Sequence, residues 1–194
     1  GLVVDELSKK NGRTSIIQVY RYHNRQPEGT LENDRVGSVI CFDHMTQLAF
    51  FLDDVYNKQE FPESDTERRS FFSPQSMIQN ANYLWTAQNI DYVQSVLDEA
   101  KGEKDRRLRE QTVFYEGYPM ATFLLTVQNR VHSSWQGFLG WKEMGFQVAF
   151  RSFLELLYLM DEALLLVKYH GNNARLQQVL KERWMAAKRS NTTK

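Results

Sequence analysis

Residues 13–23 read RTSIIQVYRYH, and this stretch decides which fold the sequence predicts. Six of its eleven residues are Thr, Ile, Val or Tyr, types that favour strands. The stretch that follows, residues 24–35, is polar and contains Pro27 and Gly29, so it reads as a loop. A lone strand leaves its backbone donors and acceptors unpaired. Its partner is therefore expected to be residues 36–42 or the same strand of a second copy.

Beyond residue 42 the pattern predicts helices. Asp43 is a candidate N-cap, Ser73-Pro74 is a helix-start signal, and Gly171 is a candidate C-cap. The expected helices span about 43–57, 73–101, 117–131, 146–170 and 174–188. The helix at 146–170 is apolar nearly all round, which is typical of a central buried helix. Glycines 137, 140 and 145 mark a connection before it, and no internal repeat is evident.

The predicted fold class is therefore mainly α. We expect a helical bundle whose N-terminal β-strand forms an intermolecular two-stranded ribbon. The expected organisation is a flexible segment at 1–12, a single mostly helical domain at 13–188 with its strand at 13–23, and a basic tail at 189–194.

Composition narrows the class of protein. The chain has 194 residues, of which 42% are hydrophobic and 25% charged, values that exclude a disordered chain. A single cysteine, Cys41, excludes an internal disulfide framework, and its apolar neighbours predict a buried, inert thiol. No signal peptide opens the sequence, and charges interrupt the apolar stretch at 146–169. We expect a cytoplasmic protein with no membrane partner.

The charges are unevenly distributed although they sum to zero. Residues 9–25 carry five bases and no acid, residues 26–174 are acidic in sum, and residues 175–194 carry six bases against Glu182. Basic ends on an acidic body favour contact with phosphate, because the local field attracts polyanions. The alternative is that Lys and Arg collect at solvated termini.

No enzyme motif is present. The sequence lacks a glycine-rich phosphate loop, a G-x-S-x-G nucleophile, a His-Glu metal helix and a C-x-x-C pair. Asp161 and Glu162 lie in the most apolar predicted helix, but adjacent helical residues point about 100° apart. A hydrolase using either carboxylate therefore ranks last. We expect no enzymatic activity, no cofactor and no metal.

The strand at 13–23 has a more specific interpretation as a DNA reader. A two-stranded ribbon, one strand from each chain, fits the DNA major groove. Thr14, Gln18 and Tyr20 share one strand face with Ile16, while Ile17 and Val19 share the other. With Ile17 and Val19 inward, Gln18 is placed to bond adenine, Thr14 to touch a thymine methyl and Tyr20 to contact phosphate.

The bases around the strand are assigned to the DNA backbone. These residues are Lys9, Lys10, Arg13 and Arg21. The opposite parity, with Ser15 and Arg21 in the groove and Ile16 buried, stays open because both faces carry an isoleucine. An edge strand packed on its own helical body is a further alternative.

The order of motifs resembles the AcaB-like family, which is encoded on conjugative plasmids and integrative elements. After the strand, the matching segments are RQPEG at 25–29, VGSVI at 36–40, YLW at 83–85, VLDE at 96–99, GYPMATFLL at 117–125 and ALLLVKY at 163–169. The resemblance spans about residues 13–170 and implies a dimeric transcription factor of ribbon-helix-helix type that promotes transfer genes. The charged segment 101–110 and the basic tail depart from the pattern, and no role is transferred to them.

The predicted function is sequence-specific binding of double-stranded DNA by a homodimer, in the regulation, expected to be activation, of conjugative transfer genes. Gln18 and Tyr20 are the predicted groove contacts. The alternative is a non-enzymatic, helical protein-interaction component of a transfer system.

Overall fold

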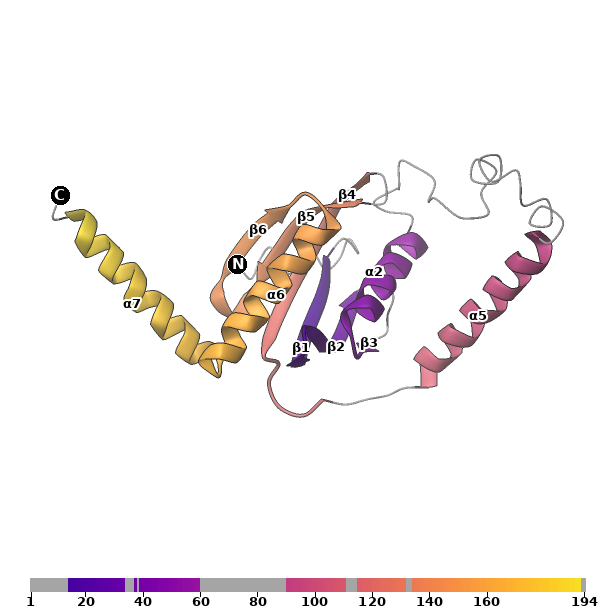
Figure 1. Cartoon of the computed structure of the whole chain (residues 1–194), viewed down its shortest axis with the longest axis horizontal. Coiled ribbons are helices and arrows are strands. Elements are labelled where there is room, and N and C mark those ends of the chain that lie inside the picture. Colours follow the sequence, from indigo (N-terminus) through magenta and orange to yellow (C-terminus); the bar gives the residue numbers. More distant parts are fainter. Residues whose placement is uncertain are drawn as a thin grey trace. The chain divides into compact units, whose positions relative to one another are not determined.

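A computed structural model describes residues 14–33, 37, 39–59, 90–110, 115–131 and 134–192. The chain divides into two compact units, one formed by Gly1–Asp65 with Phe114–Lys194 and the other by Thr66–Val113. The described part of the second unit is helix α5 (Ile90–Glu110), which exposes Tyr92 and Leu97. All other described elements belong to the first unit (Figure 1).

A six-stranded antiparallel sheet forms the centre of the first unit. Its strands, in spatial order, are β3 (Val39–Phe42), β2 (Gln26–Asn33), β1 (Thr14–His23), β4 (Ala121–Val131), β5 (Ser134–Trp141) and β6 (Phe146–Phe150). The helices are α2 (Met45–Gln59), α6 (Phe153–His170) and α7 (Asn173–Thr192), with a short 3-10 turn η1 (Lys142–Met144).

This sheet shows that the predicted fold class is wrong. Strand β1 lies in the middle of the sheet and pairs with β2 on one side and β4 on the other. Because both of its edges already have partners, β1 has no edge left to offer a second chain. The molecule is therefore not a helical bundle with an intermolecular ribbon. Nor is β1 an edge strand packed on a helical body.

The six strands with α2 and α6 form two βββα halves related by a constant spacing in the sequence, and α7 follows the second half. The first half is β1-β2-β3-α2 and the second is β4-β5-β6-α6. Strands β2 and β5 correspond from end to end, since Gln26–Asn33 and Ser134–Trp141 differ by the same 108 positions that separate Gly29 from Gly137. Strand β1 has a register shift between Val19 and Arg21, and β4 has one at the equivalent place. An internal repeat is therefore present, although the sequence did not reveal it.

The two halves meet at the β1–β4 pair as if about a two-fold axis. Ile16 pairs with Leu124, its own equivalent in the second half. Thr14 pairs with Thr126, which is the equivalent of Gln18 in the second half. Gln18 in turn pairs with Thr122, which is the equivalent of Thr14. The chain therefore contains within itself the symmetric antiparallel strand pair that had been expected between two copies.

Glycines at equivalent positions explain why both halves take this form. A Cβ on Gly29 or Gly137 would overlap a backbone carbonyl oxygen of the neighbouring strand, that of Gln18 or Thr126. Both positions therefore require glycine for close strand approach. Gly37 and Gly145, the residues before the last strand of each half, have φ of 66° and 68°, values that favour glycine.

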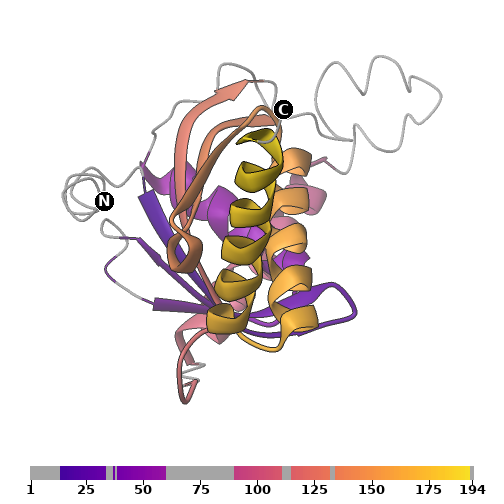
Figure 2. The same cartoon turned by 90° about the vertical axis from the view of Figure 1, so that its left-hand side faces the viewer.

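Helices α2 and α6 cover the same face of the sheet (Figures 1 and 2). On that inner face Ile17 and Val19 are fully buried, and Phe123 and Leu125 continue the layer on β4. Helix α6 buries one side against it, with Leu156, Met160, Ala163, Leu164 and Val167. Leu154, Tyr158, Leu165 and Tyr169 on α6 are exposed. Helix α6 is thus not the central buried helix that its composition predicted.

Several helix predictions agree with the structure and others do not. The expected helices at 43–57 and 174–188 correspond to α2 and α7, and the expected helix at 146–170 is β6 followed by α6. The expected helix at 117–131 is strand β4, and the glycine-marked connection is strand β5. The polar stretch at 24–35 contains strand β2. The residues of the expected helix before Ile90 lie outside the described residues.

Candidate functional site

The structure places the predicted DNA contacts of β1 on the outer face of the sheet. Ile17 and Val19 point into the core, so Gln18 and Tyr20 point outward, which is the first of the two parities considered. The Gln18 side-chain oxygen accepts hydrogen bonds from the hydroxyls of Tyr20 (3.3 Å) and Thr30 (3.5 Å). The Tyr20 ring is stacked on Tyr115, with the ring centroids 4.7 Å apart. Both side chains therefore already have partners within the chain.

Of the remaining predicted DNA contacts, the structure describes Thr14 and Arg21. Thr14 is buried and its hydroxyl lies 2.9 Å from that of Thr126. Arg21 is exposed and lies 3.6 Å from the carboxylate of Glu28. Lys9, Lys10 and Arg13 lie outside the described residues.

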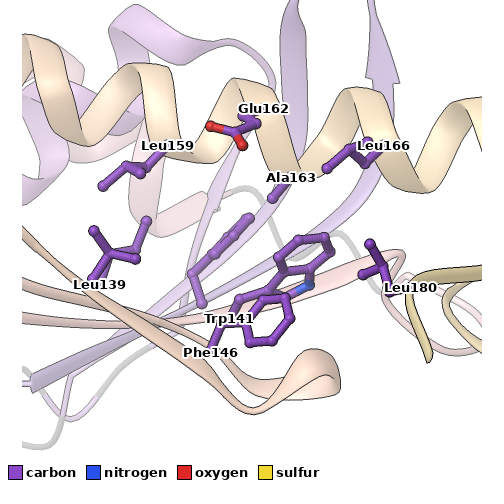
Figure 3. A pocket seen from close by; sticks show the side chains of 10 residues that line it. Leu139, Trp141, Phe146, Leu159, Glu162, Ala163, Leu166 and Leu180 are labelled. Atoms are coloured by element: carbon purple, nitrogen blue, oxygen red, sulfur yellow. The ribbon is translucent and has the colours of Figure 1, made fainter. Parts of the chain in front are cut away.

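A different site lies under α6, on the inner face of the second half. It is a cavity of about 240 Å³ between the sheet, α6 and the first turns of α7. Its lining residues are Phe123, Leu139, Trp141, Phe146 and Val148 from the strands, Leu159, Glu162, Ala163 and Leu166 from α6, and Leu180 from α7. Figure 3 shows the strand side chains facing those of α6, with Leu180 at one end. We call this the α6 pocket.

The α6 pocket is apolar but includes two groups capable of polar contact. Glu162 is its only charged lining residue and is exposed on α6. The indole Nε1–H of Trp141 is buried and makes no hydrogen bond with the part of the chain that the structure describes. A buried donor without a partner costs roughly 1–3 kcal/mol, so a ligand with an acceptor at this point gains that hydrogen bond.

The anchoring of α7 determines the shape of the pocket. Asn173 Nδ2 donates to the carbonyl oxygen of Met120 (2.9 Å), and Gln177 donates to that of Glu143. Leu176 is fully buried. Glu143 in turn accepts the backbone N–H of Thr122, while burial raises the pKa of its carboxyl. These contacts hold the first turns of α7 against η1 and against Met120, the residue before β4.

Asp161, considered above as a catalytic carboxylate, serves as a link between the two halves. It accepts a hydrogen bond from the Tyr22 hydroxyl and pairs with the Arg25 guanidinium at 2.6 Å. Asp53 of α2 is the equivalent of Asp161, and Arg130 of β4 is the equivalent of Tyr22. The Arg130 guanidinium lies 3.9 Å from the Asp53 carboxylate and so links the halves in the reverse direction. Each half thus reaches the helix of the other from the end of its first strand. Asp161 lies outside the lining of the α6 pocket.

The described ranges contain neither a metal-binding cluster nor a membrane-spanning helix. No group of three His, Cys, Asp or Glu side chains there is arranged to hold a metal ion. None of the helices that the structure describes has the length and apolar character needed to span a bilayer. Cys41 is half-buried rather than fully buried.

A comparison with protein-family models gives no match to this chain, and comparisons with curated proteins and with solved structures give none either. The resemblance to the AcaB-like family therefore stays a prediction, as do the DNA-binding and transfer-gene roles that it implies.

Sequence reasoning missed the pocket residues for an identifiable reason. Trp141 falls in the stretch interpreted as a glycine-marked connection, and Phe146 falls at the start of the expected helix at 146–170. Trp135, Leu139 and Trp141 alternate with Gln136, Phe138 and Gly140, and this period of two is the signal of a strand. Reading it places both tryptophans on one face with Leu139.

Proposed function

We propose that this protein is a non-enzymatic protein-interaction module, whose α6 pocket takes up one apolar side chain of a partner protein. The observation that carries the proposal is the pocket itself, a cavity of about 240 Å³ with nine apolar lining residues and one carboxylate. Apolar pockets that receive an anchor side chain supply most of the binding free energy in many interfaces.

The two polar groups at the pocket define the partner's chemistry further. A residue that inserts its side chain brings its own backbone carbonyl and N–H groups close to the pocket mouth. The unpartnered Nε1–H of Trp141 suits a carbonyl oxygen, and Glu162 suits an N–H or a basic side chain nearby. The favoured partner is thus an apolar residue in a segment that also carries positive charge.

Binding is favoured over catalysis because of the groups that surround the pocket. General acid-base or nucleophilic catalysis requires at least two polar groups facing one substrate. Among the residues that line the pocket Glu162 is the only one with an acidic side chain, and the lining includes no base or nucleophile opposite it.

A model compound tests this proposal directly. N-acetyl-phenylalaninamide has an apolar side chain between two amide carbonyls, and a molecule of its size binds a fitting pocket with a dissociation constant on the order of 1 mM. In a ¹H–¹⁵N correlation spectrum we expect its addition to shift the Trp141 indole resonance saturably. No shift of that resonance at about ten times this concentration would contradict the proposal.

Two matched substitutions locate the contact. Trp141→Phe keeps an aromatic ring but removes the N–H, so we expect binding to weaken by about 5-fold, in line with one neutral hydrogen bond of about 1 kcal/mol. Trp135→Phe removes a second buried indole that does not line the pocket, and it should leave the affinity unchanged. Equal effects of both substitutions would mean that the probe binds elsewhere.

A further inference from the structure

Three aromatic side chains form part of the wall of the α6 pocket. Phe123 and Trp141 are buried, whereas Phe146 is 51% exposed and borders the mouth. The rings of Trp141 and Phe146 have their centroids 6.2 Å apart and their planes at 77° to each other. A group in the angle between two such rings faces both of them and can lie within about 6 Å of each centroid. Because the face of an aromatic ring is negative, these walls suit a cation as well as an apolar group.

The single charged residue of the pocket, Glu162, is exposed at its edge. Figure 3 shows its carboxylate between Leu159 and Ala163 on the pocket side of α6. In the part of the chain that the structure describes, no Lys, Arg or His lines the pocket and none forms an ion pair with Glu162. The neighbouring Asp161, in contrast, is paired with Arg25. A ligand that brings positive charge to this edge therefore gains an attraction that these side chains leave available.

The kind of cation follows from the rest of the lining. The ammonium group of an ordinary lysine is strongly hydrated and has three N–H donors, whereas the lining offers them one carboxylate, that of Glu162. A trimethylammonium group has the same charge, an apolar surface and no N–H donor. Its methyl groups can contact the aromatic rings while its charge lies near Glu162. The space is sufficient, because the cavity of about 240 Å³ is larger than the cavity of about 150 Å³ that holds benzene.

We propose that the side chain taken up by the α6 pocket is a trimethylated lysine of the partner protein. This inference rests on the proposed function and names the residue that the partner inserts. Trimethyllysine combines in one side chain the apolar surface and the positive charge that the pocket favours. Its four methylene groups suit the aliphatic residues that complete the lining, which are Leu139, Val148, Leu159, Leu166 and Leu180. Binding is then controlled by methylation of the partner.

Three model compounds that differ only at the end of the side chain test this inference on the full chain. They are the N-acetyl amides of trimethyllysine, of unmodified lysine, and of the isostere in which carbon replaces the charged nitrogen of trimethyllysine. Titration followed at the Trp141 indole resonance measures each dissociation constant. We expect the trimethyllysine compound to bind at least about 5-fold more tightly than the uncharged isostere, which is the effect of a cation on aromatic rings. It should exceed the lysine compound by a similar factor.

Two substitutions assign this preference to the pocket. Phe146→Leu keeps an apolar side chain but removes a ring, and Glu162→Gln keeps the size but removes the charge. Each is expected to weaken binding of the trimethyllysine compound by roughly 2- to 5-fold and to leave binding of the uncharged isostere nearly unchanged. Glu155→Gln, on α6 but outside the lining, is the matched control and should alter neither affinity. Equal losses for the charged and the uncharged compound would overturn the inference.

The outcomes separate this inference from the proposed function. An isostere that binds as tightly as the trimethyllysine compound overturns the inference and leaves the apolar pocket of the proposed function in place. If neither these compounds nor N-acetyl-phenylalaninamide shift the Trp141 resonance, both are wrong. Choline has the same charged head on a shorter stem, so we expect it to bind more weakly than the trimethyllysine compound. Choline that binds at least as tightly would assign the pocket to a free small molecule and would overturn the inference.

Discussion

The two βββα halves share a backbone but fill the space beneath their helices differently. In the first half Ser15 and Asn33 lie at the positions that Phe123 and Trp141 occupy in the second. Ser15 Oγ lies 3.1 Å from the Tyr56 hydroxyl of α2 and accepts a hydrogen bond from Asn33 Nδ2 at 3.0 Å. Small polar residues on the strands thus meet a large aromatic residue on the helix.

In the second half this distribution of sizes is reversed. The strands carry the aromatic rings of Phe123 and Trp141, and α6 carries Leu159 where α2 has the fully buried Phe51. The α6 pocket lies between these aromatic rings and the smaller helix residue. A nearly symmetric scaffold therefore holds an asymmetric site, and the proposed binding function belongs to the second half alone.

The largest expected effect on the free energy of unfolding concerns the glycines at equivalent positions in the two halves. Gly29→Ala and Gly137→Ala should each destabilise the protein by more than about 4 kcal/mol, because the new Cβ meets backbone rather than a movable side chain. Urea unfolding followed by circular dichroism measures the loss. Gly140→Ala is the control, since its Cβ would lie 3.5 Å from that of Leu124, an ordinary contact. A large effect in only one half would show that the repeat is not under the same constraint throughout.

The next effect compares the packing beneath α2 with the packing beneath α6. Phe51→Ala should cost about 3–5 kcal/mol, because it empties a closed interior. Leu159→Ala should cost about 1 kcal/mol or less, because its side chain is half-buried and already borders a cavity. Thermal unfolding of the two variants measures the difference. Equal losses would mean that the α6 pocket is closed in solution.

A smaller effect compares the polar network with the unpartnered indole. Ser15→Ala removes a partner of both Tyr56 and Asn33 and should cost about 1–3 kcal/mol. Burial already raises the pKa of the Tyr56 phenol above its ordinary value, so its hydroxyl stays neutral. Trp141→Phe should change stability by less than about 1 kcal/mol, because its N–H has no described partner to lose. A larger loss for Trp141→Phe than for Ser15→Ala would contradict this account.

The smallest effect concerns Asp161, which links the halves. Burial raises the pKa of its carboxyl in the folded protein. The folded state then holds the proton more tightly than the unfolded state, so this contribution to stability is present at low pH and is lost as pH rises through the folded pKa. Asp161→Asn should remove that part of the pH dependence, by less than about 1 kcal/mol. Urea titrations of both proteins across the acidic range measure it, and parallel curves would contradict the prediction.

The sequence correctly predicted those elements in which the spacing of the apolar residues fits a strand or a helix but not both. The strand at 13–23 and the helices α2 and α7 are of this kind. Strand β4 was misread because its sequence satisfies two periods. Phe123, Leu124 and Val127 fit a helix, whereas Phe123, Leu125 and Val127 fit a strand. The neighbouring strands β1 and β5 decide between the two structures, because they pair with β4, and the sequence of one segment does not contain that information.

The repeat and the pocket were missed for different reasons. Few residues are shared between the halves, among them Val19 with Val127 and Phe42 with Phe150. A repeat of this length with so few identities is visible only once the strands are paired. The pocket depends on the relative sizes of side chains that face each other across the sheet and helix. None of the predicted site residues that the structure describes, which are Thr14, Gln18, Tyr20 and Arg21, lines it.

The central pair of strands joins residues far apart along the chain, since the hydroxyls of Thr14 and Thr126 that meet there are 112 positions apart. Each half otherwise consists of neighbouring strands and one helix, which are quick to form. We therefore expect the pairing of β1 with β4, which joins the two halves, to be the slow, non-local step of folding. The entropic cost of closing a loop grows only by about 0.6 kcal/mol for each doubling of its length. We therefore expect insertions of different size between α2 and β4 to leave the sheet intact.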